Sequence, residues 1–181
     1  MVQFSERLLR EIWSSDLCHV TCVPVPYAQE TVLIARELDI PEVLKRALYE
    51  LARSKDPRDK LSLDDLRRVR AAHGELQIAW AGFVWSVPNA HAFHCAGRPD
   101  SKAPYGGCMA AAGHDRFQTW RDVLEEEELF SPSDPLYALQ RLAEIDWSCR
   151  GYCPSCVQAR REAFTRKREE WWSKLDQWLE L

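Results

Sequence analysis

Two cysteines in the short motif CPSC, Cys153 and Cys156, are the residues of this sequence best suited to chemistry. Two thiolates separated by two residues can bind one metal ion, because the tight turn between them points both sulfurs the same way. Helical periodicity begins directly after the motif, so amides at the start of that helix can donate to the sulfurs and offset their charge. The motif therefore predicts half of a structural zinc site, which needs two further ligands.

Two more cysteines, Cys95 and Cys108, lie in a stretch that lacks helical periodicity, residues 90–113. The stretch also holds four glycines, two prolines and two histidines, and it is long for a structureless loop in a compact domain. A bound metal ion would explain how such a segment is ordered. We therefore predict one structural Zn²⁺ ion on Cys95, Cys108, Cys153 and Cys156, which would hold this loop against the last helix.

Several neighbouring residues could replace one of these ligands. Cys149 lies four residues before Cys153, and three histidines, His91, His94 and His114, crowd the same region. Partly exposed or core histidines are the commoner outcome for His91 and His114. His94 adjoins Cys95, and neighbouring residues rarely share one metal ion comfortably. The sequence leaves open whether His94, His114 or Cys149 takes the place of a cysteine ligand.

A further group of ligand-type residues lies near the N-terminus, where Cys18 and Cys22 flank His19. These three residues could form a second metal site. Free cysteines are among the most buried residue types, so we expect Cys18 and Cys22 to be buried thiols instead.

The CPSC motif also resembles the redox motif of thioredoxin-like enzymes, in which the first thiolate is the nucleophile. That function requires a strand before the motif and a mixed βαβ context. The preceding residues, DWSCRGY, do not resemble a buried strand. A thiol-disulfide oxidoreductase is therefore kept as an alternative to the zinc site.

Other catalytic patterns are absent: the sequence has no GxSxG, no HExxH and no phosphate-binding loop. We therefore predict a non-enzymatic protein that works by binding another protein. A basic stretch on the last predicted helix suggests a nucleic-acid-binding regulator as an alternative, but acidic residues interleave with it and favour an ordinary solvated face. The basic residues are Arg160, Arg161, Arg166, Lys167 and Arg168.

Composition fits an intracellular globular protein. The 181 residues are 46% hydrophobic and 29% charged, with a net charge of −4, so nothing global indicates nucleic acid or a membrane surface. The N-terminus lacks the pattern of a secretory signal, and no apolar run approaches the length of a membrane helix. We expect the cytosol or nucleus, where thiols stay reduced and seven cysteines indicate metal ligands or buried thiols before disulfides.

Helical periodicity dominates the rest of the chain, and no run of alternating residues is convincing as a strand, so we predict an all-α fold. Two helix starts are specific. Ser62 and Asp65 form a capping box, and Asp134 followed by Pro135 combines an acidic N-cap with proline at the first helical position. We divide the chain into an N-terminal helical segment, residues 1–60, and a zinc-stabilised helical domain with a long C-terminal helix, residues 61–181.

The last helix repeats apolar residues by sevens, at Val157, Phe164, Trp171 and Trp178. This spacing predicts one buried face along the helix. Trp172 lies off that face, so we expect it to be exposed.

The order of several motifs resembles the region that follows the BTB/POZ domain in proteins of mushroom-forming fungi. The motifs are ETVLIARELDIPEVLKRALYELAR, LSLDDLRRV, FVWSVP, the separated Cys95 and Cys108, DPL, CPSC, and the closing EEWWSKLDQWLEL. The resemblance covers about residues 30–181. It implies a BTB-associated interaction module whose four cysteines fall on Cys95, Cys108, Cys153 and Cys156, with no counterpart of Cys149.

Two departures limit what the resemblance implies. The family closes with LP..FGL, whereas this chain closes with LDQWLEL. The 29 residues before Glu30 are too few for a BTB domain, so that domain's roles in oligomerisation and ubiquitin-ligase assembly are not expected of this chain.

Overall fold

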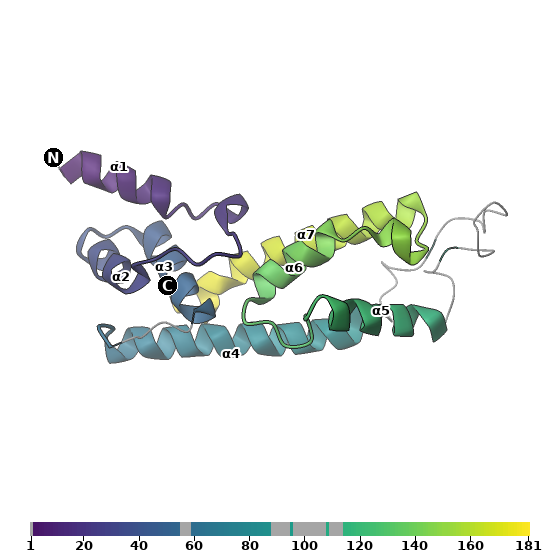
Figure 1. Ribbon diagram of the computed structural model, residues 1–181. Helices are drawn as coiled ribbons and strands as arrows, with labels where there is room; N and C mark the ends of the chain where they lie inside the picture. The colour runs from purple at the N-terminus through teal and green to yellow at the C-terminus, as the bar shows by residue number, and fades with distance from the viewer. Residues whose placement is uncertain (1, 55–58, 88–94, 96–107, 109–113) are drawn as a thin grey trace. The chain divides into compact units, whose positions relative to one another are not determined.

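The computed structural model of the protein describes residues 2–54, 59–87, 95, 108 and 114–181, apart from the side chains of residues 2–5 and 114–116. These residues form helices and contain no strand, so the predicted all-α fold is confirmed (Figure 1). None of the described helices is both long enough and apolar enough to cross a membrane. In chain order the elements are α1 Val2–Ile12, the 3-10 helix η1 Leu17–His19, α2 Ala28–Glu37, α3 Pro41–Arg53, α4 Leu63–Ser86, α5 His114–Glu126, α6 Pro135–Glu144, the 3-10 helix η5 Trp147–Arg150 and α7 Pro154–Trp178.

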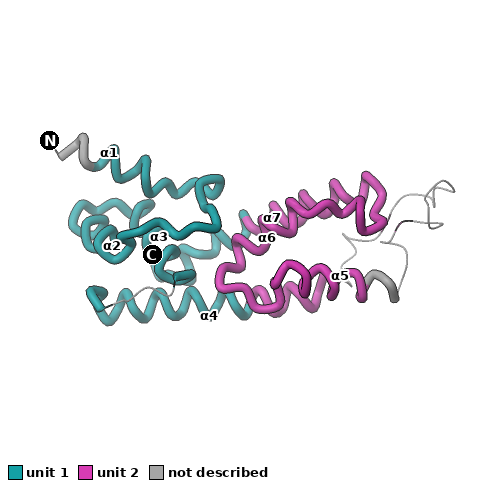
Figure 2. The backbone as a smooth tube through the Cα atoms, in the orientation of Figure 1, with its two compact units in different colours: residues 1–78, 169–181 teal, residues 79–168 magenta. Residues whose placement is uncertain are grey.

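The chain forms two compact units (Figure 2). Unit 1 comprises residues 1–78 and 169–181, and unit 2 comprises residues 79–168. The sequence predicted one boundary, between residues 60 and 61. The compact units instead divide within α4, whose first residues belong to unit 1, and within α7, whose first residues belong to unit 2. The capping box at Ser62 predicted where α4 begins but not that the helix continues to Ser86.

Both predicted helix starts are present. The Ser62 hydroxyl accepts from the Asp65 amide at 3.1 Å, and it donates to the Asp65 carboxylate at 2.8 Å, so the carboxylate bonds the cap side chain rather than its backbone. The Asp134 carboxylate accepts from the Tyr137 amide at 3.0 Å at the start of α6. Each cap satisfies an amide that the first turn of a helix leaves without a partner.

The core of unit 1 gathers around α3, whose Val43, Ala47 and Leu48 have no exposed surface. The C-terminal end of α7 and the residues after it complete the core with Leu175 and Leu179, which are also fully buried. Helix α3 is buried along its whole length after its first turn, polar residues included. An element surrounded in this way must pair its charged groups internally, because an unpaired buried charge is costly.

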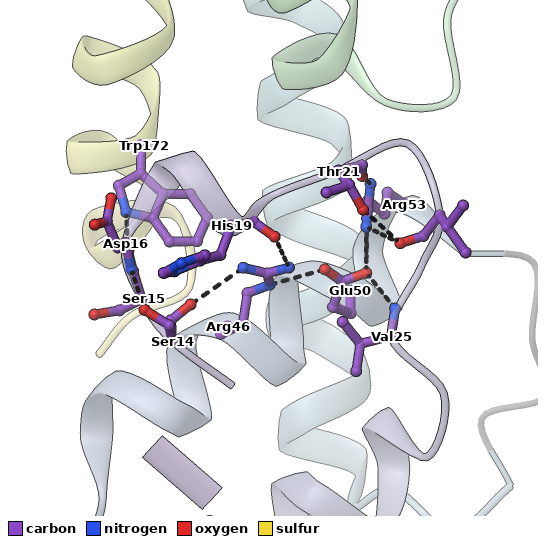
Figure 3. Close-up of polar contacts among 11 residues, drawn as sticks. Ser14, Ser15, Asp16, His19, Thr21, Val25, Arg46, Glu50, Arg53 and Trp172 are labelled. Carbon is purple, nitrogen blue, oxygen red and sulfur yellow. Dashed lines mark hydrogen bonds and ion pairs between the residues drawn. The ribbon is translucent and has the colours of Figure 1, made fainter. Parts of the chain in front are cut away.

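Three charged residues of α3, Arg46, Glu50 and Arg53, form a buried network that holds the segment between α1 and α2 (Figure 3). The Glu50 carboxylate lies between the two guanidinium groups, with N–O distances of 2.8 and 2.7 Å. Arg46 donates to the main-chain carbonyls of Ser14 and His19. Arg53 donates to the main-chain carbonyls of Thr21 and Val23. The segment is thus held by its main chain, and many of its side chains are exposed, whereas Val20 is buried.

Trp172 contradicts the prediction that it lies exposed, off the apolar face of α7. It is 9% exposed, against 4% for Trp171. Its indole donates to the Ser15 carbonyl at 3.0 Å, its ring meets Tyr49 edge-on at 5.3 Å, and the Lys45 ammonium lies 4.8 Å above it. The heptad pattern predicts one buried face of the helix, whereas the adjacent residues Trp171 and Trp172 are both buried near the end of α7.

Unit 2 is built on aromatic side chains. Phe164 of α7 has no exposed surface and lies against Trp120, Trp147 and Phe83 at centroid distances of 5.9–6.3 Å. The buried indoles satisfy their N–H groups with main-chain carbonyls, since Trp120 donates to Val84 and Trp147 donates to Leu142, each at 2.9 Å. Helix α6 lies along α7, where the Arg168 guanidinium donates to the Leu136 carbonyl (Figure 1).

Candidate metal centre

The turn that presents Cys153 is built by η5 and the residue that ends it. The Asp146 carboxylate caps η5 by accepting from the Ser148 amide at 3.0 Å. Gly151 ends the element with φ of 80°, a left-handed conformation that favours glycine. Tyr152 then packs edge-on against the buried Trp147, with ring centroids 5.5 Å apart. The chain therefore enters the CPSC motif from a fixed position.

The Arg160 side chain reinforces this turn from one helical turn beyond Cys156. Its guanidinium lies 4.1 Å from the centroid of Tyr152 and 4.7 Å from that of Trp147. Arg160 is only 2% exposed, so these cation–π contacts are made away from water, where they are strongest. A further ion pair joins Arg150 of η5 to Glu126 at the end of α5.

The four predicted cysteines converge on one point in unit 2. The sulfurs of Cys95, Cys108, Cys153 and Cys156 all lie within 4.8 Å of one another. The Cys95 and Cys153 sulfurs are 3.8 Å apart, far beyond a disulfide bond. Cys156 is buried and the other three are half-buried. The group could hold a metal ion, as the sequence predicted from the two cysteine pairs.

The distance between the Cys95 and Cys153 sulfurs suits tetrahedral coordination. Zinc–thiolate bonds are about 2.3 Å long, and the edge of a regular tetrahedron is about 1.6 times the distance from centre to corner. Two sulfurs on one zinc ion should therefore lie about 3.8 Å apart, which is the Cys95–Cys153 separation. No rearrangement of this pair is needed to admit the ion.

The surroundings treat the two cysteines of the motif differently. Burial acts to raise the pKa of the Cys153 thiol, but hydrogen bonds from the Cys156 amide and from the other three thiols lower it below its ordinary value. Burial is the main cause that raises the pKa of Cys156. The Cys153 amide in turn donates to the Cys108 sulfur at 3.3 Å. Amides at the start of α7 thus point at sulfurs, as thiolate binding requires.

Cys149 does not join the group. Its thiol is exposed and donates to the Asp146 carboxylate at 3.1 Å, a contact that raises the pKa of the thiol. Among the predicted substitutes, His91 and His94 lie outside the described residues, and so does the side chain of His114.

The prediction of buried thiols at Cys18 and Cys22 is wrong, because both are exposed. The network on α3 holds this segment by its carbonyls, and the two side chains therefore face solvent. A second convergent group does occur here, but with a different membership: Asp16, Cys18 and His19, whose ligand atoms lie within 4.8 Å of one another. The sequence paired Cys18 with Cys22 by spacing and overlooked Asp16, whose role as N-cap of η1 brings its carboxylate back over the turn.

The predicted basic stretch is not one continuous surface. Arg160 is buried against the rings of Trp147 and Tyr152, and Arg168 donates to a main-chain carbonyl of α6. Arg161 and Arg166 are exposed. Two of the five predicted nucleic-acid contacts therefore have structural roles, which a reading of charge alone could not separate from the others.

The residues before the CPSC motif form a 3-10 helix and a turn, and the described residues contain no strand. The βαβ context of a thioredoxin-like site is therefore missing from this part of the chain.

Compared with known proteins, the chain matches no family model, no curated protein sequence and no solved structure.

Proposed function

We propose that this chain is a non-enzymatic protein-interaction module whose unit 2 is stabilised by one structural zinc ion. The observation that carries the proposal is the convergence of Cys95, Cys108, Cys153 and Cys156 within 4.8 Å. These cysteines come from segments up to about 60 residues apart, since Cys95 and Cys153 are separated by 58 positions. Bringing four thiols together without a metal ion would serve no evident packing purpose.

Zinc is the metal that this ligand set favours. Four soft thiolates in tetrahedral arrangement are typical of zinc or iron–sulfur sites, and closed sites with four protein ligands are structural. Four thiolates and one Zn²⁺ carry a formal charge of −2, which the amides at the start of α7 can partly offset. Binding would contribute directly to folding, on the order of 10 kcal/mol in small zinc peptides.

The closed shell is also the reason to propose binding rather than catalysis. A zinc ion on four thiolates has no open position for water, so it cannot generate a hydroxide nucleophile. The resemblance to the region after BTB/POZ domains in mushroom-forming fungi supports a protein partner, in the cytosol or nucleus.

The test compares cysteine variants within one chain. Wild-type protein purified without chelator should contain about one equivalent of tightly held zinc. Each of four single variants should lose that zinc: Cys95→Ser, Cys108→Ser, Cys153→Ser and Cys156→Ser. Cys149→Ser is the matched control, because Cys149 lies four residues from Cys153 yet bonds Asp146. Loss of zinc from Cys149→Ser with retention in Cys153→Ser would overturn the proposed ligand set.

The interaction role needs a second measurement. Partners captured by the wild-type chain should be lost by Cys156→Ser, which breaks the site, and kept by Cys149→Ser, which does not. A chain that hydrolyses or oxidises a substrate in a zinc-dependent manner would contradict the non-enzymatic assignment.

A further inference from the structure

The exposed group Asp16, Cys18 and His19 in unit 1 is unrelated to the four-cysteine site. It offers one carboxylate oxygen, one thiol sulfur and one imidazole nitrogen within 4.8 Å. We propose that these three residues bind a second divalent transition-metal ion, of which Zn²⁺ is the best match, in an open and readily exchanged site.

The ligand chemistry is that of a borderline-soft cation. Thiolate and imidazole both favour zinc and its first-row neighbours, and a carboxylate oxygen is the third donor that zinc sites use. A thiolate and a carboxylate would neutralise the two positive charges of the ion, with a neutral imidazole as the third ligand. The site therefore forms without the excess negative charge of a four-thiolate site.

The local turn already directs the ligands at one another. The Asp16 carboxylate accepts from the Cys18 amide at 3.1 Å and from the Cys18 thiol. A metal ion bound here would take the place of the thiol proton between sulfur and oxygen, releasing that proton to solvent. The step changes which cation the two groups share and leaves the turn itself intact.

The backbone beneath the group is fixed from outside it. Arg46, which is 1% exposed, donates to the Ser14 carbonyl at 3.1 Å and to the His19 carbonyl at 3.0 Å. The Trp172 indole donates to the Ser15 carbonyl between them (Figure 3). Both ends of the ligand turn are thus anchored to the core of unit 1, so metal binding need not order a flexible loop. Lower ordering cost means higher affinity for the same ligands.

Exposure sets the character of the site. All three residues are exposed, so water would complete the coordination shell and exchange would be rapid. This behaviour differs from that of the four-cysteine site, where Cys156 is buried. The two sites should therefore be separable by how readily a chelator removes each ion.

The experiment is a Zn²⁺ titration by calorimetry on the full, untagged, reduced chain after dialysis against a mild chelator that leaves the tightly held zinc in place. Wild-type protein should bind about one further equivalent. Cys18→Ser should weaken that event by at least about tenfold, the scale on which even supporting residues alter metal affinity. Cys22→Ser is the matched control, since it removes another exposed cysteine four residues away.

A second variant, His19→Gln, separates loss of a ligand from misfolding. It removes the imidazole but keeps the His19 carbonyl that Arg46 contacts. It should also lose the second ion while keeping the helical circular dichroism of the wild type. Unchanged binding by Cys18→Ser and His19→Gln would overturn the proposal, and so would an equal loss from Cys22→Ser. Neither result depends on whether the four-cysteine site holds zinc.

Discussion

Glu50 is the acidic residue at the centre of the buried network that holds the N-terminal segment. Its side chain has no exposed surface and lies between Arg46 and Arg53, whose side chains are 1% and 2% exposed. It also accepts from the Val25 amide at 3.2 Å. Removing its charge would take away the carboxylate that pairs with both buried guanidinium groups, which is far more costly than losing an exposed pair.

Glu50→Gln should therefore destabilise the protein by about 3–5 kcal/mol in urea unfolding. Glu11→Gln is the control: Glu11 pairs with Arg7 on α1, but their side chains are 61% and 82% exposed. Its cost should stay within about 0.5 kcal/mol. Similar losses from the two variants would mean that the network on α3 does not hold the segment.

Asp65 should make stability depend on pH. Burial acts to raise its pKa, but hydrogen bonds from Arg36 and Ser62 and the charges of Arg36 and Arg68 lower it below the ordinary value. A carboxyl with a lowered folded-state pKa adds stability above its unfolded pKa of about 3.9 and loses it as the pH falls through the folded value.

Asp65→Asn should thus cost about 1–3 kcal/mol near neutral pH, the usual loss for a buried hydrogen-bonded group. The difference from wild type should shrink as the pH falls below about 4. Asp64→Asn serves as the control, because the neighbouring Asp64 side chain is 77% exposed. A difference that stays constant down to acid unfolding would show that the charge of Asp65 contributes nothing.

At the scale of elements, the end of α7 is the clearest test of packing. Trp171 and Trp172 are both buried, so truncating either should leave a large cavity. Trp172→Ala should cost about 3–5 kcal/mol by denaturant unfolding. Trp85→Ala removes the same side chain from a position that is 81% exposed and should cost less than about 0.5 kcal/mol. Equal effects would contradict the burial of Trp172.

Elements with local signals were predictable from the sequence. The capping box at Ser62 and the acidic cap at Asp134 are signals contained in four consecutive residues each. Both helix starts that they predict are present. The four cysteines could be grouped because metal ligation imposes a known spacing and number. Burial set by distant parts of the chain could not be foreseen. Trp172 is covered by Ser15 and Tyr49, and Cys18 is exposed in a turn whose backbone Arg46 holds at Ser14 and His19.

At the scale of the whole molecule, the two compact units should respond differently to metal removal. The four-cysteine group lies entirely in unit 2, within residues 79–168. Stripping zinc with a strong chelator should accelerate amide hydrogen exchange first at the start of α7, around Cys156. Amides of α3 near Leu48 should keep their protection, because their contacts are carried by the core of unit 1. Uniform acceleration in both units would contradict a local structural role for the metal.

The zinc site that we propose in unit 2 is closed, with four thiolates as its ligands. X-ray absorption at the zinc edge tests it most directly, and Cys18→Ser is the protein to use, so that the second proposed site adds no signal. The first shell should contain four sulfurs at about 2.3 Å from the zinc ion. A shell with fewer than four sulfurs and an oxygen at about 2.0–2.2 Å would contradict it, because an open position would reopen hydrolytic chemistry at this centre.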